Sequence, residues 1–325
     1  MFQNALTAVA TMLILMGIGF LFAWKGWLDE DGNRLLSALV IRTALPGTIL
    51  TTMLTTFTRA QLADVAVLLL IPLSNMLVWI YAARFFARLF KVPENRRGVF
   101  TALCVFSNTV FIGFPVVRAL LGEIAIPYAT VYYLANTSMF WILGAGQIQR
   151  DSPEYLNESG DSKPRESTGQ TLLSALKRLC SPPFVTLLVS IILVLFGVTL
   201  PAPIMNAASS IGALVTPVSM VFIGSMLCRV IRGGFKWERG FGALLGIRYL
   251  LAPALMVVTC LIFQVKGLPA QVFVLQTGMA TMTQVAIIAH GYGADSEYAS
   301  LGIALSTISL MVVLPLYALA LPLLG

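Results

Sequence analysis

The chain has 325 residues, of which 58% are hydrophobic and only 11% are charged, and its formal net charge at pH 7 is +7. A soluble domain of this length needs a surface of which about a quarter is charged. The composition therefore excludes a soluble enzyme, a nucleic-acid-binding module, a disulfide-stapled secreted domain and a disordered chain. It is typical of an all-α polytopic membrane protein, in which cytoplasmic Lys and Arg account for the positive charge and no nucleic acid partner is expected.

Charged residues are so sparse that the gaps between them mark the expected membrane spans. A helix needs about 20 apolar residues to cross the hydrocarbon, and long unbroken runs favour helices over barrel strands. Residues 179–228 lack charge and are long enough for two helices, which Pro201 and Pro203 separate because proline ends helices. Ten spans follow, at residues 3–24, 35–56, 64–86, 98–121, 124–147, 182–200, 204–228, 241–264, 269–291 and 296–322.

The basic residues predict the orientation of these spans. With the amino terminus outside, the inward loops hold 16 of the 21 Lys and Arg residues and the outward loops hold three. This is the positive-inside pattern, so we expect a multi-pass protein of the plasma (inner) membrane, surrounded by lipids, with both termini outside. The first span has no basic region before it and no small-residue cleavage site, so it is expected to remain as a signal-anchor-type span.

A hydrophilic stretch at residues 149–171 divides the spans five and five. It is expected to be a flexible cytoplasmic connector, followed by a short interfacial helix at residues 172–179. The predicted domains are a first five-helix repeat (1–148), the connector with its interfacial helix (149–181) and a second five-helix repeat (182–325).

The two halves match weakly at a nearly constant offset. Pro46 lies in the middle of the second span, and Pro217 lies 171 residues later in the middle of the seventh; two further short matches have offsets of 173 and 170. An odd number of spans in each half gives the halves opposite orientations. We therefore expect a 5+5 inverted repeat, an arrangement typical of secondary transporters with a substrate site near the midplane.

The best candidate site lies in the middle of the fourth span, where Ser107, Asn108 and Thr109 precede Gly113 and Pro115. Pro115 removes a backbone donor and clashes with the carbonyl four residues back, and Gly113 weakens the preceding turn. We expect the helix to break here and to leave polar groups that need a wet cavity or a ligand. The alternative is that these polar side chains join neighbouring helices.

The ninth span carries a second polar cluster without a proline, made of Gln276, Thr277, Gly278, Thr281, Thr283 and Gln284. Such a cluster inside a charge-free run is costly unless it faces a cavity. Asn136 in the fifth span and Ser306 in the tenth either face the same cavity or join helices.

Two arginines lie within spans. Arg42 and Arg248 each either act as a counter-ion for a carboxylate or extend to the headgroups, and the second role is favoured. No Asp or Glu lies deep in a span, which disfavours a carboxylate proton relay, and the dispersed cysteines have no metal-binding spacing. Neither a metal nor another cofactor is expected.

The stretch Ser107–Gly122 resembles the fourth-helix crossover of the auxin efflux carrier family, which includes plant auxin exporters and bacterial permeases for malonate, malate and similar acids. The pattern Asn108-Thr109-x-x-x-Gly113-x-Pro115 carries the resemblance, and Leu45-Pro46, Thr216-Pro217 and Gly291–Asp295 fit it over most of the chain. It implies ten helices in a 5+5 inverted repeat, with broken helices 4 and 9 that cross at the site. It further implies that Asn108 contacts the substrate carboxylate, and it allows a homodimer. Thr283 stands where the family usually has the ninth-helix proline.

The leading hypothesis is a secondary transporter, not an enzyme, that moves small organic anions by alternating access. Asn108 would bind the carboxylate, with Ser107, Thr109, Gly113 and Asn136 beside it, and Thr281, Thr283 and Gln284 would line the other side. Pro115, Pro46, Pro217 and Gly278 would shape the helices. The alternatives are a membrane sensor or channel, and an intramembrane hydrolase that uses Ser225 and His290, although this pair lacks a nucleophile elbow and an orienting partner.

Overall fold

The computed structural model describes residues 2–56, 58, 67–157, 182–234 and 236–320. The regular elements of these residues are helices, and the pairing of extended backbone among them is an isolated bridge between Ser107 and Thr281. The all-α prediction is therefore confirmed. The predicted interfacial helix at residues 172–179 and most of the predicted connector lie outside the described residues.

The helices follow one another in a simple order, with η marking a short 3₁₀ or π turn. The first half of the chain contains α1 (Phe2–Trp24), α2 (Glu30–Leu39), η1 (Val40–Ala44), α3 (Leu45–Thr56), α5 (Leu70–Leu89), η2 (Glu94–Arg96), α6 (Arg97–Val105), η3 (Thr109–Gly113), α7 (Phe114–Leu121), η4 (Glu123–Ala125), α8 (Ile126–Met139), η5 (Phe140–Gly144), α9 (Ala145–Gln149) and α10 (Pro153–Asn157). The second half contains α12 (Pro182–Phe196), α13 (Ala202–Gly212), α14 (Val215–Gly233), α15 (Phe241–Gly246), η6 (Ile247–Leu251), α16 (Ala252–Ile262), α17 (Leu268–Thr277), α18 (Gln284–Gly291) and α19 (Ser296–Ala320).

The surface of the molecule is suited to lipid. Five helical stretches of the described chain are long and apolar enough to cross a membrane, at residues 30–55, 70–89, 202–233, 241–262 and 296–320. Large apolar side chains are exposed along them, among them Leu250, Ile262 and Val312, each at least 70% exposed. Exposed apolar side chains on helices of this length are those expected of an integral membrane protein.

Three prolines each follow a π turn that runs directly into an α-helix. Pro46 follows η1, Pro115 follows η3 and Pro253 follows η6, each as the second residue after the turn. A proline clashes with the carbonyl four residues back, and in each case that carbonyl belongs to the π turn. The wider turn makes room for the ring, so the helix continues through each of these prolines. Pro217 has a different place, in the first turn of α14 just after the chain leaves α13.

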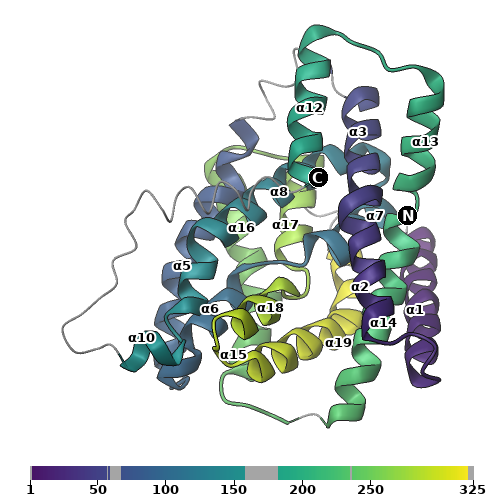
Figure 1. Cartoon of the computed structure of the whole chain (residues 1–325). Coiled ribbons are helices and arrows are strands. Elements are labelled where there is room, and N and C mark those ends of the chain that lie inside the picture. The colour runs from purple at the N-terminus through teal and green to yellow at the C-terminus, as the bar shows by residue number, and fades with distance from the viewer. Residues whose placement is uncertain (1, 57, 59–66, 158–181, 235, 321–325) are drawn as a thin grey trace.

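Small residues bring the helices at one side of the molecule close together. A Cβ on Gly19 would lie 2.0 Å from the Val221 carbonyl oxygen, and one on Gly224 would lie 1.8 Å from that of Met16. Helices α1 and α14 therefore pack backbone to backbone, side by side in Figure 1, as small residues permit in membranes. Helix α3 lies against α12 and α13 in the same group.

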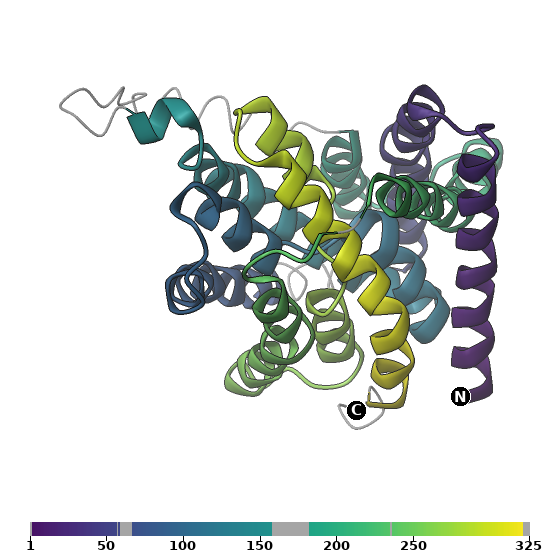
Figure 2. The same ribbon diagram turned by 90° about the horizontal axis from the view of Figure 1, so that it is seen from below.

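The remaining helices surround two interrupted ones. The chain passes from α6 through η3 to α7, and later from α17 to α18, with a gap in regular structure each time. Helix α19 contacts α18, α15 and α6 and runs diagonally across the middle of Figure 2. The two interruptions contain the predicted polar clusters.

Candidate functional site

The interruption after α6 coincides with the polar cluster predicted in the fourth span. Helix α6 ends at Val105, the backbone of Phe106 is extended, and the π turn η3 begins at Thr109. Asn108 caps the new helix, because its Oδ1 accepts a hydrogen bond of 3.1 Å from the backbone N–H of Phe111. A short polar side chain at this position satisfies one of the free donors of a helix start.

The interruption after α17 forms without a proline. Helix α17 ends at Thr277 and α18 begins at Gln284, so Thr283 leads into the second segment. Gly278 follows α17 where a Cβ would lie 2.6 Å from the Tyr317 ring. The close ring requires a glycine at this point, and a tyrosine of α19 thereby takes part in shaping the break.

The two interruptions pair with each other. The N–H of Asn108 donates to the Ala280 carbonyl over 2.8 Å, and the N–H of Met282 donates to the Phe106 carbonyl over 3.0 Å. These bonds form the antiparallel bridge between Ser107 and Thr281, both of which are fully buried. Backbone groups that leave a helix inside a membrane protein need other partners. Here each break supplies the partners of the other, and residues 106–108 and 278–283 are called the paired breaks below.

A polar side chain of a neighbouring helix supports the backbone of each break. Asn136 of α8 bonds both backbone groups of Ser107: its Oδ1 accepts from the N–H over 3.1 Å and its Nδ2 donates to the carbonyl over 3.0 Å. Ser306 of α19 holds Thr281 similarly, because its Oγ accepts from the Thr281 N–H over 3.1 Å and lies 2.9 Å from the Thr281 Oγ1. The structure thus places Asn136 at the site as a support of the break.

Arg248 lies against both breaks, which the sequence analysis did not anticipate. The side chain is fully buried, and its guanidinium donates to the carbonyls of Cys104 and Met279 over 2.8 Å each and to the hydroxyl of Ser107. It comes from the π turn η6. The predicted preference for a side chain that extends to the headgroups is therefore wrong for Arg248.

Several buried polar atoms beside the paired breaks have no hydrogen-bond partner within the described part of the chain. They include the Nδ2 of Asn108, the Oγ1 of Thr109 and both amide atoms of Gln276. Gln276 is fully buried against Gly113, where a Cβ would lie 2.0 Å from its Oε1. Buried polar groups in native proteins are normally paired. These atoms can donate to and accept from a polar ligand.

The other predicted residues lie at the edge of the paired breaks or outside them. Thr283 and Gln284 are half-buried at the start of α18, while Arg42 is exposed in η1. Pro115 lines a cavity of about 450 Å³ together with hydroxyl residues of α3 and α13–α14, namely Thr48, Thr51, Thr52, Ser209 and Thr216. Ser225, considered as a nucleophile, instead pairs with Asn33 over 2.6–2.8 Å.

Two carboxylates fix helix starts outside the spans. Asp151 accepts from the N–H groups of Gly98 and Val99 over 2.9 and 2.7 Å at the start of α6. Burial raises the pKa of Asp151 to about 6, although the two backbone hydrogen bonds oppose this rise. Asp295 accepts from Arg96 over 2.7 Å and caps α19 through the N–H of Tyr298.

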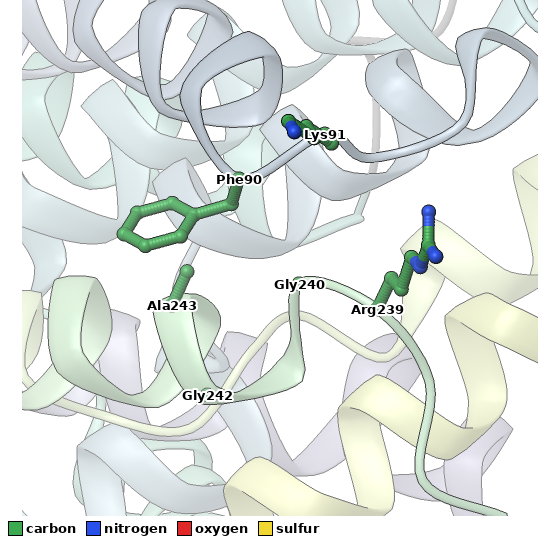
Figure 3. Close-up of a pocket in the computed structure, with 6 residues that line it drawn as sticks. All are labelled: Phe90, Lys91, Arg239, Gly240, Gly242 and Ala243. Atoms are coloured by element: carbon green, nitrogen blue, oxygen red, sulfur yellow. The ribbon is translucent and has the colours of Figure 1, made fainter.

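A separate hollow of about 470 Å³ lies between the end of α5 and the start of α15 (Figure 3). Phe90 extends over Ala243 in this view, and the side chains of Lys91 and Arg239 lie to the right of Phe90. None of its lining residues belongs to the paired breaks. The hollow is therefore distinct from the candidate site.

Comparison with known proteins identifies the family. The profile of the membrane transport protein family matches residues 4–318. The chain belongs to this family. The resemblance to auxin efflux carriers is thereby confirmed.

Two similar members of the membrane transport protein family match over nearly their whole length. An uncharacterized transporter of Methanocaldococcus jannaschii is 25% identical, with 95% of this chain and 96% of the relative covered. An uncharacterized transporter of Methanothermobacter thermautotrophicus is 26% identical, with 98% and 99% covered.

Sequence reasoning gave too little weight to three residues of this membrane transport protein. Gln276 and Ser306 were noticed only as members of polar clusters, and Arg248 was considered only as a counter-ion for a carboxylate or as a side chain that extends to the headgroups. One general rule could have singled out Arg248: an ionisable residue inside a membrane span marks a functional site by default. Its partners could not have been predicted, because they are backbone carbonyls that become available only where helices break.

Proposed function

We propose that this membrane transport protein is a secondary transporter that moves small organic anions, carboxylates, across the plasma (inner) membrane. The substrate would bind at the paired breaks. The observation that carries this proposal is the buried, unpaired Nδ2 donor of Asn108, which lies where two interrupted helices meet. A donor left unpaired in such a place costs about 1–3 kcal/mol unless a ligand accepts from it.

The helix starts at the paired breaks favour a negative charge. The segment from η3 to α7 begins at Thr109, and α18 begins at Gln284. The free N–H groups of a helix start carry a partial positive charge and bind anions. A carboxylate between these two helix starts would be stabilised by the partial positive charge of each and would accept a hydrogen bond from Asn108. The Gln276 amide supports the same assignment, since it offers a further donor.

The arrangement of the elements supports a 5+5 inverted repeat. Asn136 holds Ser107 in the first half, and about 170 residues later Ser306 holds Thr281 in the second. The two breaks pair antiparallel, as a pseudo-two-fold axis between inverted halves requires. In this interpretation helices 4 and 9 of ten cross at the substrate site.

Alternating access would follow from movement between two groups of helices. One group contains α1, α3 and α12–α14, and the other contains the interrupted helices with α8 and α19. The cavity of about 450 Å³ lies between them, since α3, α13 and α14 line one side and Pro115 and Arg118 of α7 line the other. We propose this cavity as the route from one side of the membrane to the paired breaks. The homodimer and the outside position of both termini remain predictions.

The test is uptake into proteoliposomes under an imposed membrane potential. The panel would contain labelled malate, malonate, lactate, an indole acid and a neutral amino acid. We expect saturable, potential-sensitive uptake of at least one acid. A folded, monodisperse protein that takes up none of the acids would overturn the proposed substrate class.

Asn108 offers a variant that separates binding from folding. Asn108→Asp keeps the Oδ1 that caps η3 but replaces the free donor with an anionic oxygen. Loss of one hydrogen bond to a charged group costs about 1.5–3 kcal/mol, so affinity should fall at least about tenfold. Asn206→Asp, on an exposed position of α13, is the matched control. Unchanged uptake by Asn108→Asp would remove Asn108 from the site.

A further inference from the structure

Arg248 has an environment that is unusual for an arginine. Its side chain is fully buried, and no carboxylate pairs with it among the described residues. A buried charge is costly unless it is paired or fully hydrogen-bonded. Arg248 is hydrogen-bonded instead of paired with an opposite charge, since every partner of the guanidinium is a neutral oxygen.

These oxygens come from both interrupted helices. The Nε donates to the Met279 carbonyl over 2.8 Å, the Nη1 donates to the Cys104 carbonyl over 2.8 Å, and the Nη2 bonds the Ser107 hydroxyl. The Ala280 carbonyl lies 3.5 Å from the Nη2. Cys104 lies in the last turn of α6, and Met279 and Ala280 lie just beyond α17. One planar guanidinium therefore contacts the carboxyl ends of the two helices, α6 and α17, that precede the breaks.

The carboxyl end of a helix carries a partial negative charge. In transporters with interrupted helices, unwound carbonyls and the carboxyl ends of half-helices bind the coupling cation. The carbonyls of Cys104, Met279 and Ala280 have this chemistry, and in this protein an arginine already occupies them. An arginine is always charged, and its five donors lie in a fixed plane that can serve several acceptors at once.

We propose that Arg248 is the resident cation of the paired breaks: it holds the carboxyl ends of α6 and α17 together in the place where a coupling cation would otherwise bind. Transport then needs no inorganic cation at these carbonyls. Arg248 is a positioning residue, because it bonds backbone and Ser107 and leaves the amino ends of η3 and α18 to the substrate. This last point rests on the proposed anion transport; the positioning role does not.

The proposal predicts chemical rescue. Arg248→Ala leaves a guanidinium-sized space lined by the oxygens of Cys104, Ser107, Met279 and Ala280. We expect the purified full-length variant to melt at a lower temperature than the parent. Methylguanidinium at about 20 mM should raise its melting temperature by about 2 °C or more, since a ligand that binds only the folded state stabilises it. Tetramethylammonium, which cannot donate hydrogen bonds, should not.

Arg84→Ala is the matched control, because Arg84 of α5 donates to the side chain of Gln147 over 2.7 Å, away from the paired breaks. Methylguanidinium should not raise its melting temperature. Equal effects on Arg84→Ala and Arg248→Ala, or no effect on Arg248→Ala, would overturn the proposal. If Arg248→Ala does not fold, Arg248→Lys tests the same point. The single ammonium of lysine cannot donate to all the oxygens that surround the planar guanidinium, so the variant should melt at a lower temperature than the parent. An equal melting temperature would contradict the assignment.

Uptake gives a second readout. Replacement of Na⁺ by choline should change uptake by the parent less than twofold, and a tenfold loss would show that an inorganic cation is needed after all. The melting experiments contain no substrate. Rescue by methylguanidinium without uptake of any acid would therefore refute the proposed function and leave the role of Arg248 intact.

Discussion

Asn136 provides the most demanding test of how the paired breaks are held. In Asn136→Ala both backbone groups of Ser107 lose the partner that now lies 3.0–3.1 Å away, and both remain buried. The Ser107 carbonyl keeps a second donor, the N–H of Thr109 at 2.9 Å, so only the Ser107 N–H is orphaned. The unpaired N–H costs about 1–3 kcal/mol and the lost carbonyl bond about 1 kcal/mol more, so the free energy of unfolding should fall by about 2–4 kcal/mol. Asn75→Ala is the matched control. Asn75 is as deeply buried in α5 but donates only to the Oγ1 of Thr259, which keeps its bond to the Leu255 carbonyl.

Reversible unfolding in mixed micelles measures the free energy of both variants. Asn75→Ala should lose about 1 kcal/mol, the net contribution of one ordinary hydrogen bond. Uptake should fall sharply in Asn136→Ala, because Ser107 is the neighbour of Asn108 and moves with it. A loss of stability in Asn136→Ala no larger than in Asn75→Ala would refute the reasoning. It would show that the bridge to Thr281 holds the first break without help from α8.

Two further predictions concern Gly113 and Asp151. Gly113→Ala places a Cβ 2.0 Å from the Oε1 of Gln276, so it should displace this buried amide and lower uptake about tenfold, the size of one lost hydrogen bond; Gly146→Ala, with nothing within 4 Å, should leave uptake unchanged. Equal uptake by both variants would show that the position of Gln276 is irrelevant. For Asp151, burial raises the pKa above its ordinary value to about 6, so the folded state holds its proton more tightly than the unfolded state. Stability from this group is therefore present below about pH 4 and is lost as pH rises to about 6. Asp151→Asn should abolish this decline in melting temperature, and a decline of the same size in the variant would assign it to another group.

The sequence predicted the positions of the breaks better than their causes. Pro115 was expected to end the helix, yet the chain leaves helical geometry at Phe106–Asn108, and the helix continues from η3 through Pro115 into α7. The ninth span has Thr283 where the family usually has a proline, yet the interruption between Thr277 and Gln284 is complete. Local rules for proline and glycine could not predict this, since the breaks are stabilised by partners that are distant in sequence.

The same limit explains the roles of individual residues. A polar side chain in an apolar span predicts that a partner exists, and Asn136 and Ser306 were noticed for that reason. The partner itself depends on which helices become neighbours. Arg248 shows the difficulty most clearly: an arginine about a third of the way into a span is within reach of the headgroups, and only the tertiary arrangement shows that it points to the carbonyls of Cys104 and Met279.

The charges at the paired breaks support the proposal that the substrate is negatively charged. Each interruption exposes one amino end, which is partly positive, and one carboxyl end, which is partly negative. In a break without other charges these fields largely cancel. Here Arg248 adds a full positive charge at the carboxyl ends of α6 and α17, and no carboxylate of the described residues pairs with it. The positive amino ends at Thr109 and Gln284 are then left uncompensated. The proposed anion would compensate these amino ends, whereas a cation would meet a like charge in a region with little water to screen it.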